Sequence, residues 1–385
     1  MKAREVTRHI SQPTQNQLWG QAAGRCQFRG CNRLLYRSPV TQETVNLAEK
    51  AHIHSFSEKG PRGRGRLAAS TPEVNSITNL LLVCHDCHRK IDQDIAGTRY
   101  PATLLKEWKH QHETRVRAVT GISPDFKSTV LLYGAKIGEQ PNPLCPDAAL
   151  ESMFPQWYPA EGSPLSLSMR CSHDDSLPDY WKTEADHLRK EFELQVRPRI
   201  ERADGGHLSV FAIGPQPLLV LLGSLITDKV PAEVYQLHRE PQTWRWQPES
   251  SGVQFGIGKP QAGKRGKPAL VFSLSARIDH GRVTKILGRD TAVWELACSR
   301  PGNDFLRSKA QLSAFREAAR EALAGILSEH PGLETLPVFP AMPVACAVEL
   351  GRVWMPKANP SLLIYDQHRR RGGFAPTLTI GAPHE

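Results

Sequence analysis

The chain has 385 residues, a mean hydropathy of −0.42 and no apolar run near the roughly 20 residues that span a bilayer, which argues against a membrane protein. Its N-terminal residues lack the apolar segment of a signal peptide, so we expect a cytoplasmic protein with no membrane partner. The net charge is +10, and residues 1–120 hold 19 Lys and Arg against 10 Asp and Glu, which leaves 30 against 29 in the rest. This basic region favours binding to nucleic-acid phosphates, although a solvated basic surface would have the same composition.

Four of the eight cysteines form two close pairs in the first quarter of the chain: Cys26 with Cys31, and Cys84 with Cys87. Zinc prefers four ligands in a tetrahedron, and two cysteine pairs supply them. We therefore predict a structural zinc that stabilises a small basic domain; four reduced, unliganded thiols are the alternative. His85 or His88 could replace one thiolate as a zinc ligand, but one of the four cysteines would then be unliganded. The other cysteines are scattered, and we expect buried free thiols: Cys145, Cys171, Cys298 and Cys346.

Upstream of the second cysteine pair, the segment TVNLAEKAHIHSF alternates apolar and polar residues, which is typical of a β-strand. His52 and His54 lie on the same face of this strand. A single strand histidine is usually a polar surface residue, so the interpretation depends on what accompanies the pair.

The segments AHI (51–53), NLLLVC (79–84) and CHDCH (84–88) together resemble the HNH endonuclease family, over about residues 20–95. The resemblance implies a β-hairpin and a helix around one divalent metal, the ββα-metal fold. It also implies that His52 is the general base, that Asn79 orients the hairpin loop, and that His88 binds Mg²⁺ or another catalytic divalent metal. The zinc and its four cysteines would then be scaffold.

The sequence departs from the family at Ala51, where many HNH enzymes carry an aspartate as second metal ligand. His54 shares a face with His52 and is our first choice as the substitute. Asn75 and Asp92 are the alternatives. A polar contact of His54 within the loop is equally compatible with the pattern.

The loop SEKGPRGRGRLAAS places Arg62, Arg64 and Arg66 between glycines. Such a segment can follow a phosphate backbone without reading bases, or it can be a mobile solvated loop. No element is evidently built to read base edges, so we expect cleavage of double-stranded DNA with little sequence preference. After the loop and the cysteines, the segment PATLLKEWKHQHETRVRAV repeats apolar residues at helical spacing and predicts a helix.

Composition predicts a domain boundary near residue 120. Residues 1–120 form the basic domain, residues 121–164 are rich in Pro, Gly and Ser and predict a linker, and residues 165–385 alternate strands and helices. The runs HLSVFAIG, AEVYQLHR and PALVFSLS predict strands, while PLLVLLGSLITD and KAQLSAFREAAREALAGILSEH predict helices. This repeated order predicts an α/β domain with two related halves.

The segments at 223–246 and 339–367 resemble the SAVED family, a sensor of two fused Rossmann-like halves, over about residues 165–385. The combined expectation is an α+β zinc-stapled ββα-metal (HNH) nuclease domain followed by an α/β SAVED domain. This combination resembles effector nucleases of bacterial CBASS anti-phage systems. There, a cyclic oligonucleotide from a partner cyclase binds SAVED, promotes assembly into a homo-oligomer, and the nuclease degrades DNA as an abortive-infection response.

For a cyclic di- or trinucleotide activator, the expected contacts are aromatic rings for the bases and cations for the phosphates. The tryptophans are alternatively core residues, and the cations are alternatively solvated surface charges. The predicted contacts are Trp181, Trp244, Trp246, Arg239, Arg245 and Lys357.

Two other functions fit parts of the sequence. A restriction-type HNH endonuclease would use its C-terminal domain to target particular or modified DNA, and it would cut without any nucleotide. A non-catalytic zinc module would bind DNA for regulation, and it would not need His52, Asn79 and His88 together.

Overall fold

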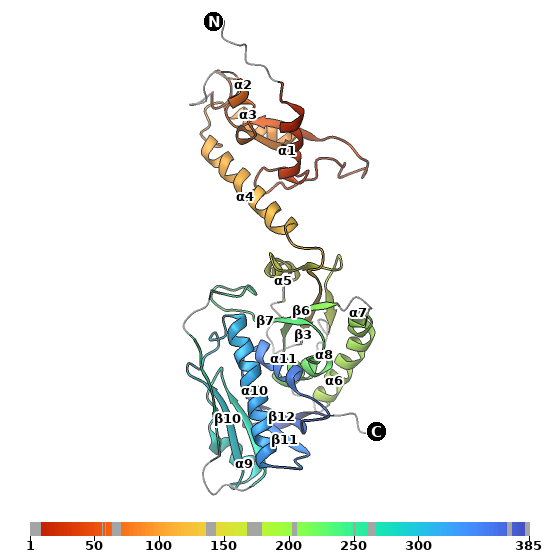
Figure 1. Ribbon diagram of the computed structural model, residues 1–385, viewed down its shortest axis with the longest axis vertical. Helices are drawn as coiled ribbons and strands as arrows, with labels where there is room; N and C mark the ends of the chain where they lie inside the picture. The colour runs from red at the N-terminus through yellow and green to blue at the C-terminus, as the bar shows by residue number, and fades with distance from the viewer. Residues whose placement is uncertain are drawn as a thin grey trace. The chain divides into compact units, whose positions relative to one another are not determined.

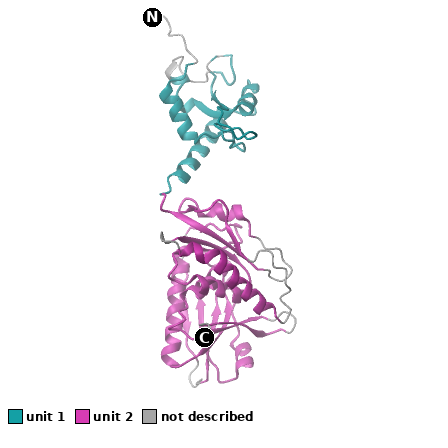
Figure 2. Cartoon of the chain, turned by 90° about the vertical axis from the view of Figure 1, so that its right-hand side faces the viewer, with its two compact units in different colours: residues 1–123 teal, residues 124–385 magenta. Residues whose placement is uncertain are grey.

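The computed structural model describes residues 9–55, 57, 59–63, 71–135, 144–167, 179–201, 206–248, 252–260, 266–367 and 372–381. The chain divides into two compact units, residues 1–123 and 124–385 (Figures 1 and 2). No helix in the described ranges combines the length and apolar character that a membrane crossing needs.

The first unit is built on a short β-hairpin followed by a helix. Its elements are α1 (Gln12–Ala22), β1 (Ala48–His52), α2 (Thr71–Val74), the 3₁₀ turn η1 (Ile77–Asn79), β2 (Leu80–Cys84), α3 (His85–Gln93) and α4 (Ala102–Thr120). β1 and β2 are antiparallel, with His52 opposite Leu80 and Ala48 opposite Cys84. Every residue of β2 is buried, so this strand lies in the core of the first unit. The predicted strand and helix around the histidines are confirmed.

The long helix α4 closes the core of the first unit and matches the predicted helix at 101–119. Leu105 and His112 are buried, and the Nε2 of His112 lies 3.0 Å from the carbonyl oxygen of Ala22 in α1. Gln27 joins this helix to the hairpin, because its Nε2 donates to Glu113 and its Oε1 accepts the N–H of Leu82. The helix therefore fixes the loop that carries the first cysteine pair.

The second unit contains two sheets, and the first is entirely parallel. Its strands are β3 (Lys127–Gly134), β4 (Tyr158–Pro159), β5 (Leu165–Leu167), β6 (His207–Ile213) and β7 (Ala232–Tyr235), in the order β4-β3-β6-β7 with β5 also paired to β3. Its helices are α5 (Pro146–Met153), α6 (Tyr180–Glu191), the π-helical turn η2 (Phe192–Val196), α7 (Arg197–Ile200) and α8 (Gln216–Ile226).

The structure corrects the predicted linker at 121–164. The second unit begins at Pro124, and β3 lies inside the first sheet. Its residues from Ser128 to Gly134 are all buried, and Lys127 at its start is exposed. The run STVLLYG is a clear strand signal, but the Pro- and Gly-rich residues that follow it dominate the composition of this segment. The second unit therefore starts about forty residues earlier than predicted.

The second sheet is parallel at its centre and antiparallel at both edges. Its strands are β8 (Phe255–Gly258), β9 (Pro268–Ser273), β10 (Ala292–Cys298), β11 (Thr335–Ala341), β12 (Ser361–Gln367) and β13 (Phe374–Ile380), in the order β13-β12-β11-β9-β10-β8. Its helices are α9 (His280–Leu287), α10 (Lys309–Glu329) and α11 (Val344–Val353). Ser308 and Gln311 form a capping box at the start of α10, which fixes where that helix begins.

The two halves meet through helices α8 and α11, which lie side by side (Figure 1). A Cβ at Gly223 of α8 would lie 1.9 Å from the carbonyl oxygen of Val348, and a Cβ at Gly351 of α11 would lie 1.9 Å from that of Val220. Each helix connects two parallel strands, β6 to β7 and β11 to β12. The predicted α/β domain of two related halves is confirmed.

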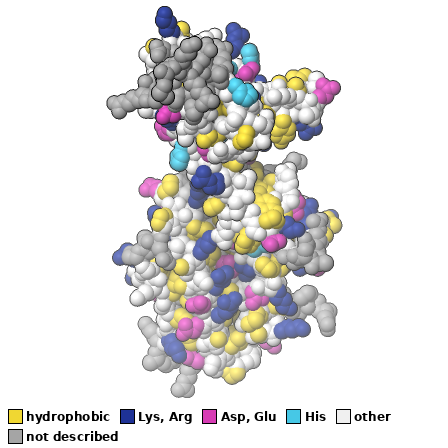
Figure 3. Space-filling model, turned by 45° about the horizontal axis from the view of Figure 1, so that its top comes forward, with side chains coloured by type: hydrophobic (Ala, Val, Ile, Leu, Met, Phe, Trp, Pro, Cys, Tyr) yellow, Lys and Arg dark blue, Asp and Glu magenta, His cyan; other side chains and the backbone are white. Residues whose placement is uncertain are grey.

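Charge on the second unit is mixed. On the face drawn in Figure 3, basic and acidic side chains are interspersed over this unit and do not gather into a patch of one sign. This agrees with the near-equal numbers of basic and acidic residues after residue 120.

Candidate active site and zinc centre

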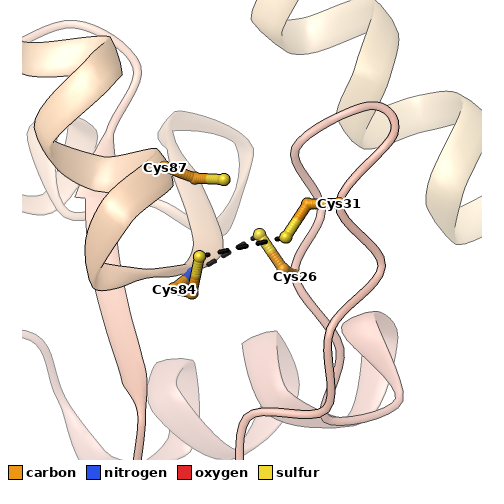
Figure 4. A group of neighbouring side chains, drawn as sticks. All are labelled: Cys26, Cys31, Cys84 and Cys87. Carbon is orange, nitrogen blue, oxygen red and sulfur yellow. Dashed lines mark hydrogen bonds between the residues drawn. The ribbon is translucent and has the colours of Figure 1, made fainter. Parts of the chain in front are cut away.

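The four paired cysteines meet at one point of the first unit (Figure 4). Cys26 and Cys31 come from the loop after α1, whereas Cys84 and Cys87 flank the junction of β2 and α3. All four sulfur atoms lie within 4.8 Å of one another, and Cys31 Sγ is 3.9 Å from Cys84 Sγ. A tetrahedral zinc with bonds of about 2.3 Å separates its sulfur ligands by about 3.8 Å. The cluster therefore fits a zinc ion.

Burial disfavours the thiolate form of two of these cysteines. Desolvation raises the pKa of Cys26 to about 12, and it also raises the pKa of Cys87 well above its usual range. Burial opposes ionisation at Cys31 too, but hydrogen bonds from the backbone of Arg33 and from the neighbouring thiols lower its pKa. Thiolates at this site need a cation to compensate them, which is the chemistry that a structural zinc supplies.

The remaining cysteines are more varied than predicted. Cys298 and Cys346 are buried free thiols, as expected, but Cys145 is exposed at the start of α5. Cys171 lies outside the described residues.

His52 ends β1, and its ring is held by an amide from the turn after α2. The Nε2 of His52 lies 2.9 Å from Oδ1 of Asn75, whose Nδ2 donates to the carbonyl oxygen of His9 at 3.1 Å. The carbonyl oxygen of His9 can only accept a hydrogen bond, so the NH₂ group of Asn75 must face His9 and its oxygen must face His52. Because that oxygen is also only an acceptor, Nε2 of His52 is the donor. The proton therefore sits on Nε2, and the lone pair of a neutral imidazole is on Nδ1.

Asn79 fastens the loop that follows His52. Its side chain is buried; Oδ1 accepts the N–H of His54 at 2.9 Å, and Nδ2 donates to the carbonyl oxygens of His54 and Val74 at 3.0 and 2.8 Å. These bonds tie the end of β1 to α2 and to the start of β2. This is the geometry that an orienting role requires.

His88 lies in α3, one residue after Cys87, and faces a carboxylate on the next turn. Its Nε2 is 3.3 Å from Oδ2 of Asp92. His54 has both backbone groups engaged by Asn79, and its Nδ1 is 3.4 Å from the carbonyl oxygen of Arg62. Within the described part of the chain, only the cysteine cluster brings three or more His, Cys, Asp or Glu ligand atoms within 4.8 Å of one another.

Arg62 is buried, and this corrects its predicted place on a phosphate backbone. Its side chain is 3% exposed and donates to the carbonyl oxygens of His52, Ile53 and Ile91. One guanidinium therefore joins the end of β1 to α3. Gly97 leaves room for it, since a Cβ there would lie 2.8 Å from Cγ of Arg62. Arg64 and Arg66 lie outside the described residues.

The predicted nucleotide contacts of the second unit are dispersed. Trp244 is 1% exposed and packs edge-on against Phe211 in the core, so its ring has no free face for a base, which corrects that prediction. Trp246 is half-buried and donates from Nε1 to Glu233, and Trp181 packs edge-on against Tyr180. Three cations are exposed, on the segment after β7 and on the turn before β12: Arg239, Arg245 and Lys357.

A cavity of about 500 Å³ opens at the carboxyl ends of β9 and β10. Its charged lining is Arg277, Asp279 and Glu295, one cation against two carboxylates. None of the predicted contacts lines it. Its charge does not match the polyanion expected there, although its place at the strand ends is typical of nucleotide sites.

Two family models match the chain. The HNH endonuclease model matches residues 26–95, and the model for SAVED, "SMODS-associated and fused to various effectors sensor domain", matches residues 188–380, half of the chain. The first match contains all four clustered cysteines together with His52, Asn79 and His88. The second contains both sets of β-α-β elements that meet through α8 and α11.

The chain also matches solved structures of Cap4 SAVED/CARF-domain containing receptors over part of their length. The receptor from Acinetobacter baumannii with the cyclic trinucleotide 3'3'3'-cAAA has 15% identity and a TM-score of 0.43, over 72% of this chain and 56% of that chain. The receptor from Moraxella osloensis has 11% identity and a TM-score of 0.41, over 76% and 64%. The chain thus spans less than two thirds of the length of either receptor. No curated protein matches it.

Proposed function

Because the chain belongs to the SAVED family and carries an HNH endonuclease domain, we propose that it is an endonuclease switched on by a cyclic oligonucleotide. Its substrate in this proposal is double-stranded DNA, cut with little sequence preference as an anti-phage, abortive-infection response of the CBASS type. The observation that carries the nuclease proposal is the contact that fixes the imidazole ring of His52. Its Nε2 is bonded to Asn75, so the lone pair on Nδ1 can accept a proton from water.

The first unit supplies the groups that phosphodiester hydrolysis requires. His52 takes the proton of the attacking water. Asn79, just before β2, holds the loop that follows His52 in place through its bonds to His54 and Val74. Arg62 holds the base strand against α3 through the carbonyl groups of His52 and Ile91. Basic residues outnumber acidic ones almost two to one in residues 1–120, which supports binding of the DNA backbone.

His88 is the proposed protein ligand of the catalytic divalent metal, with His54 as the ligand first expected to accompany it. Such a metal, when bound, polarises the scissile phosphate and stabilises the leaving 3′ oxygen. The chemistry of the residues fits: imidazole and carboxylate are ligands for first-row divalent ions, and His88 and its neighbour Asp92 are partly exposed, which leaves room for substrate. The structural zinc remains with the cysteines.

The proposed switch is assembly. One HNH site cuts one strand, so a double-strand break needs two sites or two successive cuts. We expect a cyclic di- or trinucleotide from a partner cyclase to bind the second unit and to favour a homo-oligomer, because a ligand shifts an equilibrium by its differential affinity for one state. Nucleotide-activated cutting by a protein that remains monomeric during sizing chromatography would rule out this switch.

For the nucleotide contacts, Arg239, Trp246 and Lys357 remain proposals. Arg239 and Lys357 are exposed cations, and Trp246 keeps part of its ring at the surface. Arg239→Ala and Lys357→Ala should each weaken nucleotide binding, measured by calorimetry. Unchanged affinity in both variants would remove them from the proposed site.

The decisive experiment incubates the purified protein and plasmid DNA with Mg²⁺ and a panel of cyclic di- and trinucleotides. One nucleotide should switch on degradation in the wild type and not in His52→Ala. Equal cutting without any nucleotide would leave the nuclease proposal standing and favour the restriction-type alternative. Equal cutting by His52→Ala would overturn the proposed catalytic role.

A further inference from the structure

We infer that Asp92, and not His54, is the second protein ligand of the catalytic divalent metal, in place of the aspartate that many HNH enzymes carry at the position of Ala51. The inference rests on the proposed function and names a ligand that the resemblance does not supply. Ala51 is fully buried within the core of the first unit, so its side chain faces away from any solvent-accessible metal. A second ligand has to come from elsewhere.

The spacing of His88 and Asp92 is that of two ligands of one ion. Nε2 of His88 and Oδ2 of Asp92 are 3.3 Å apart. A direct charge-assisted hydrogen bond between such groups would be about 2.7–2.9 Å long. Adjacent ligands of an octahedral ion with bonds of about 2.1 Å lie about 3 Å apart. The observed separation is that of an ion pair, and it is also close to the spacing of two ligands on one metal.

Arg62 orients the carboxylate for this role. Its guanidinium lies 3.7 Å from Oδ1 of Asp92, the oxygen that does not face His88. The two oxygens of Asp92 are therefore divided between a buried cation and the histidine. The same guanidinium donates to the carbonyl oxygen of His52. Arg62 therefore fixes the position of the proposed base relative to the proposed metal ligand. Outer partners of this kind commonly fix a ligating carboxylate.

Asp94 and Asn75, two other candidates for the second metal ligand, use their side-chain oxygens in other hydrogen bonds. Both oxygens of Asp94 accept backbone N–H groups, from Thr98, Arg99 and Tyr100, so this carboxylate caps a loop. Asn75 uses its oxygen on His52. Among the carboxylates described on α3, Asp92 is the one that faces His88.

Mn²⁺ binding tests the inference without relying on activity. The zinc-loaded full chain is titrated with Mn²⁺, and free Mn²⁺ is followed by electron paramagnetic resonance, with and without a phosphorothioate DNA duplex that resists cleavage. Asp92→Asn should weaken Mn²⁺ binding at least about tenfold, as His88→Ala should. The control Asp86→Asn removes a carboxylate of the same helix that pairs with exposed Arg33, and it should bind Mn²⁺ like the wild type.

Folding is checked by zinc content and thermal unfolding of each variant. Asp92→His adds a second readout, because imidazole favours Ni²⁺ over Mn²⁺, so this variant should recover Ni²⁺ binding that Asp92→Asn lacks. If His88→Ala weakens Mn²⁺ binding and Asp92→Asn does not, the inference is overturned and the proposed function stands. If neither variant differs from the wild type in either condition, the metal site of the proposed function fails as well.

Discussion

The Nε2 atom of His52 lies 2.9 Å from the Oδ1 atom of Asn75, and this contact selects the nitrogen that can act as base. Replacing Asn75 with Leu removes the acceptor, so the ring can turn and exchange its tautomer. We expect kcat for DNA cleavage to fall about 10- to 100-fold, because general-base catalysis contributes about 10²- to 10⁴-fold. Steady-state cleavage of plasmid DNA in the activated state measures this, and KM should change little.

Asn75→Asp separates positioning from folding. It keeps an oxygen for Nε2 but loses the bond to the carbonyl of His9, so it should retain more activity than Asn75→Leu. Asn16→Leu changes an exposed asparagine of α1 and serves as the control. Equal kcat in Asn75→Leu and wild type would show that the ring is held by something else.

Arg62→Met should affect both stability and activity. The substitution leaves three backbone carbonyl groups without their donor, and an unsatisfied buried polar group costs about 1–3 kcal/mol. We expect the free energy of unfolding of the first unit to fall by about 3 kcal/mol or more, measured by urea denaturation. Arg37→Met, in an exposed turn, is the control. A normal denaturation curve for Arg62→Met would contradict the bracing role.

Spacing along the chain was enough to predict that the four cysteines meet, whereas the resemblance to the HNH family was needed to single out His52, Asn79 and His88. These residues lie on short, regular elements, a two-stranded hairpin and the helix after it, so sequence distance translates into spatial distance. The two related halves of the sensor were predictable for the same reason, because their strands and helices alternate with clear apolar runs.

The failures involve residues whose environment is set by distant segments. Arg62 lies between glycines in a polar loop, and nothing local shows that α3 and the turn at Gly97 enclose it. Trp244 and Trp246 are two residues apart and would share one face of a strand, yet Trp244 is buried against the first sheet while Trp246 is only half-buried. Whether a cation or a large ring is buried depends on tertiary packing, and the periodicity of apolar residues along the chain does not predict it.

Removing the zinc should unfold the first unit and leave the second folded. Cys26→Ser leaves three sulfur ligands around a buried position, and a small metal-stapled domain depends on its metal for folding. Hydrogen exchange followed by mass spectrometry should show full exchange in residues 9–120 and normal protection in the second unit. The exposed Cys145→Ser is the control. Persistent protection of β1 and β2 in Cys26→Ser would show that the four cysteines are not a structural metal site.

Gly223→Ala should destabilise the second unit strongly. The added Cβ would meet the carbonyl oxygen of Val348 at 1.9 Å, and this backbone group has no room to move between two packed helices. Overpacking usually costs about 1–3 kcal/mol, and a clash with backbone should reach the upper end of that range. Gly302→Ala, where the new methyl group meets nothing within 4 Å, is the control. Both variants are compared by denaturant unfolding; equal stability would contradict the close approach of α8 and α11.

The stability of the second unit should fall as the pH drops below neutrality, partly because of His207. Its ring stacks on Trp157 at 3.6 Å and contacts Oγ of Ser128. Burial, with a smaller contribution from the nearby cations Arg352 and Lys309, lowers the pKa of His207 to about 4. The unfolded chain regains a pKa near 6.5, so between these values the unfolded state binds more protons, and acid favours unfolding.

At pH 5 the proton-linked loss at His207 is about 2 kcal/mol relative to pH 7.5. His207→Gln removes the titrating group and keeps a partner for Ser128, so its stability should depend less on pH by about this amount. His238, buried with its pKa also lowered by desolvation, contributes in the same direction in both proteins, so their difference isolates His207. His280→Gln, on the exposed start of α9, is the control. Equal pH dependence of unfolding in wild type and His207→Gln would show that this ring does not stay neutral in the folded protein.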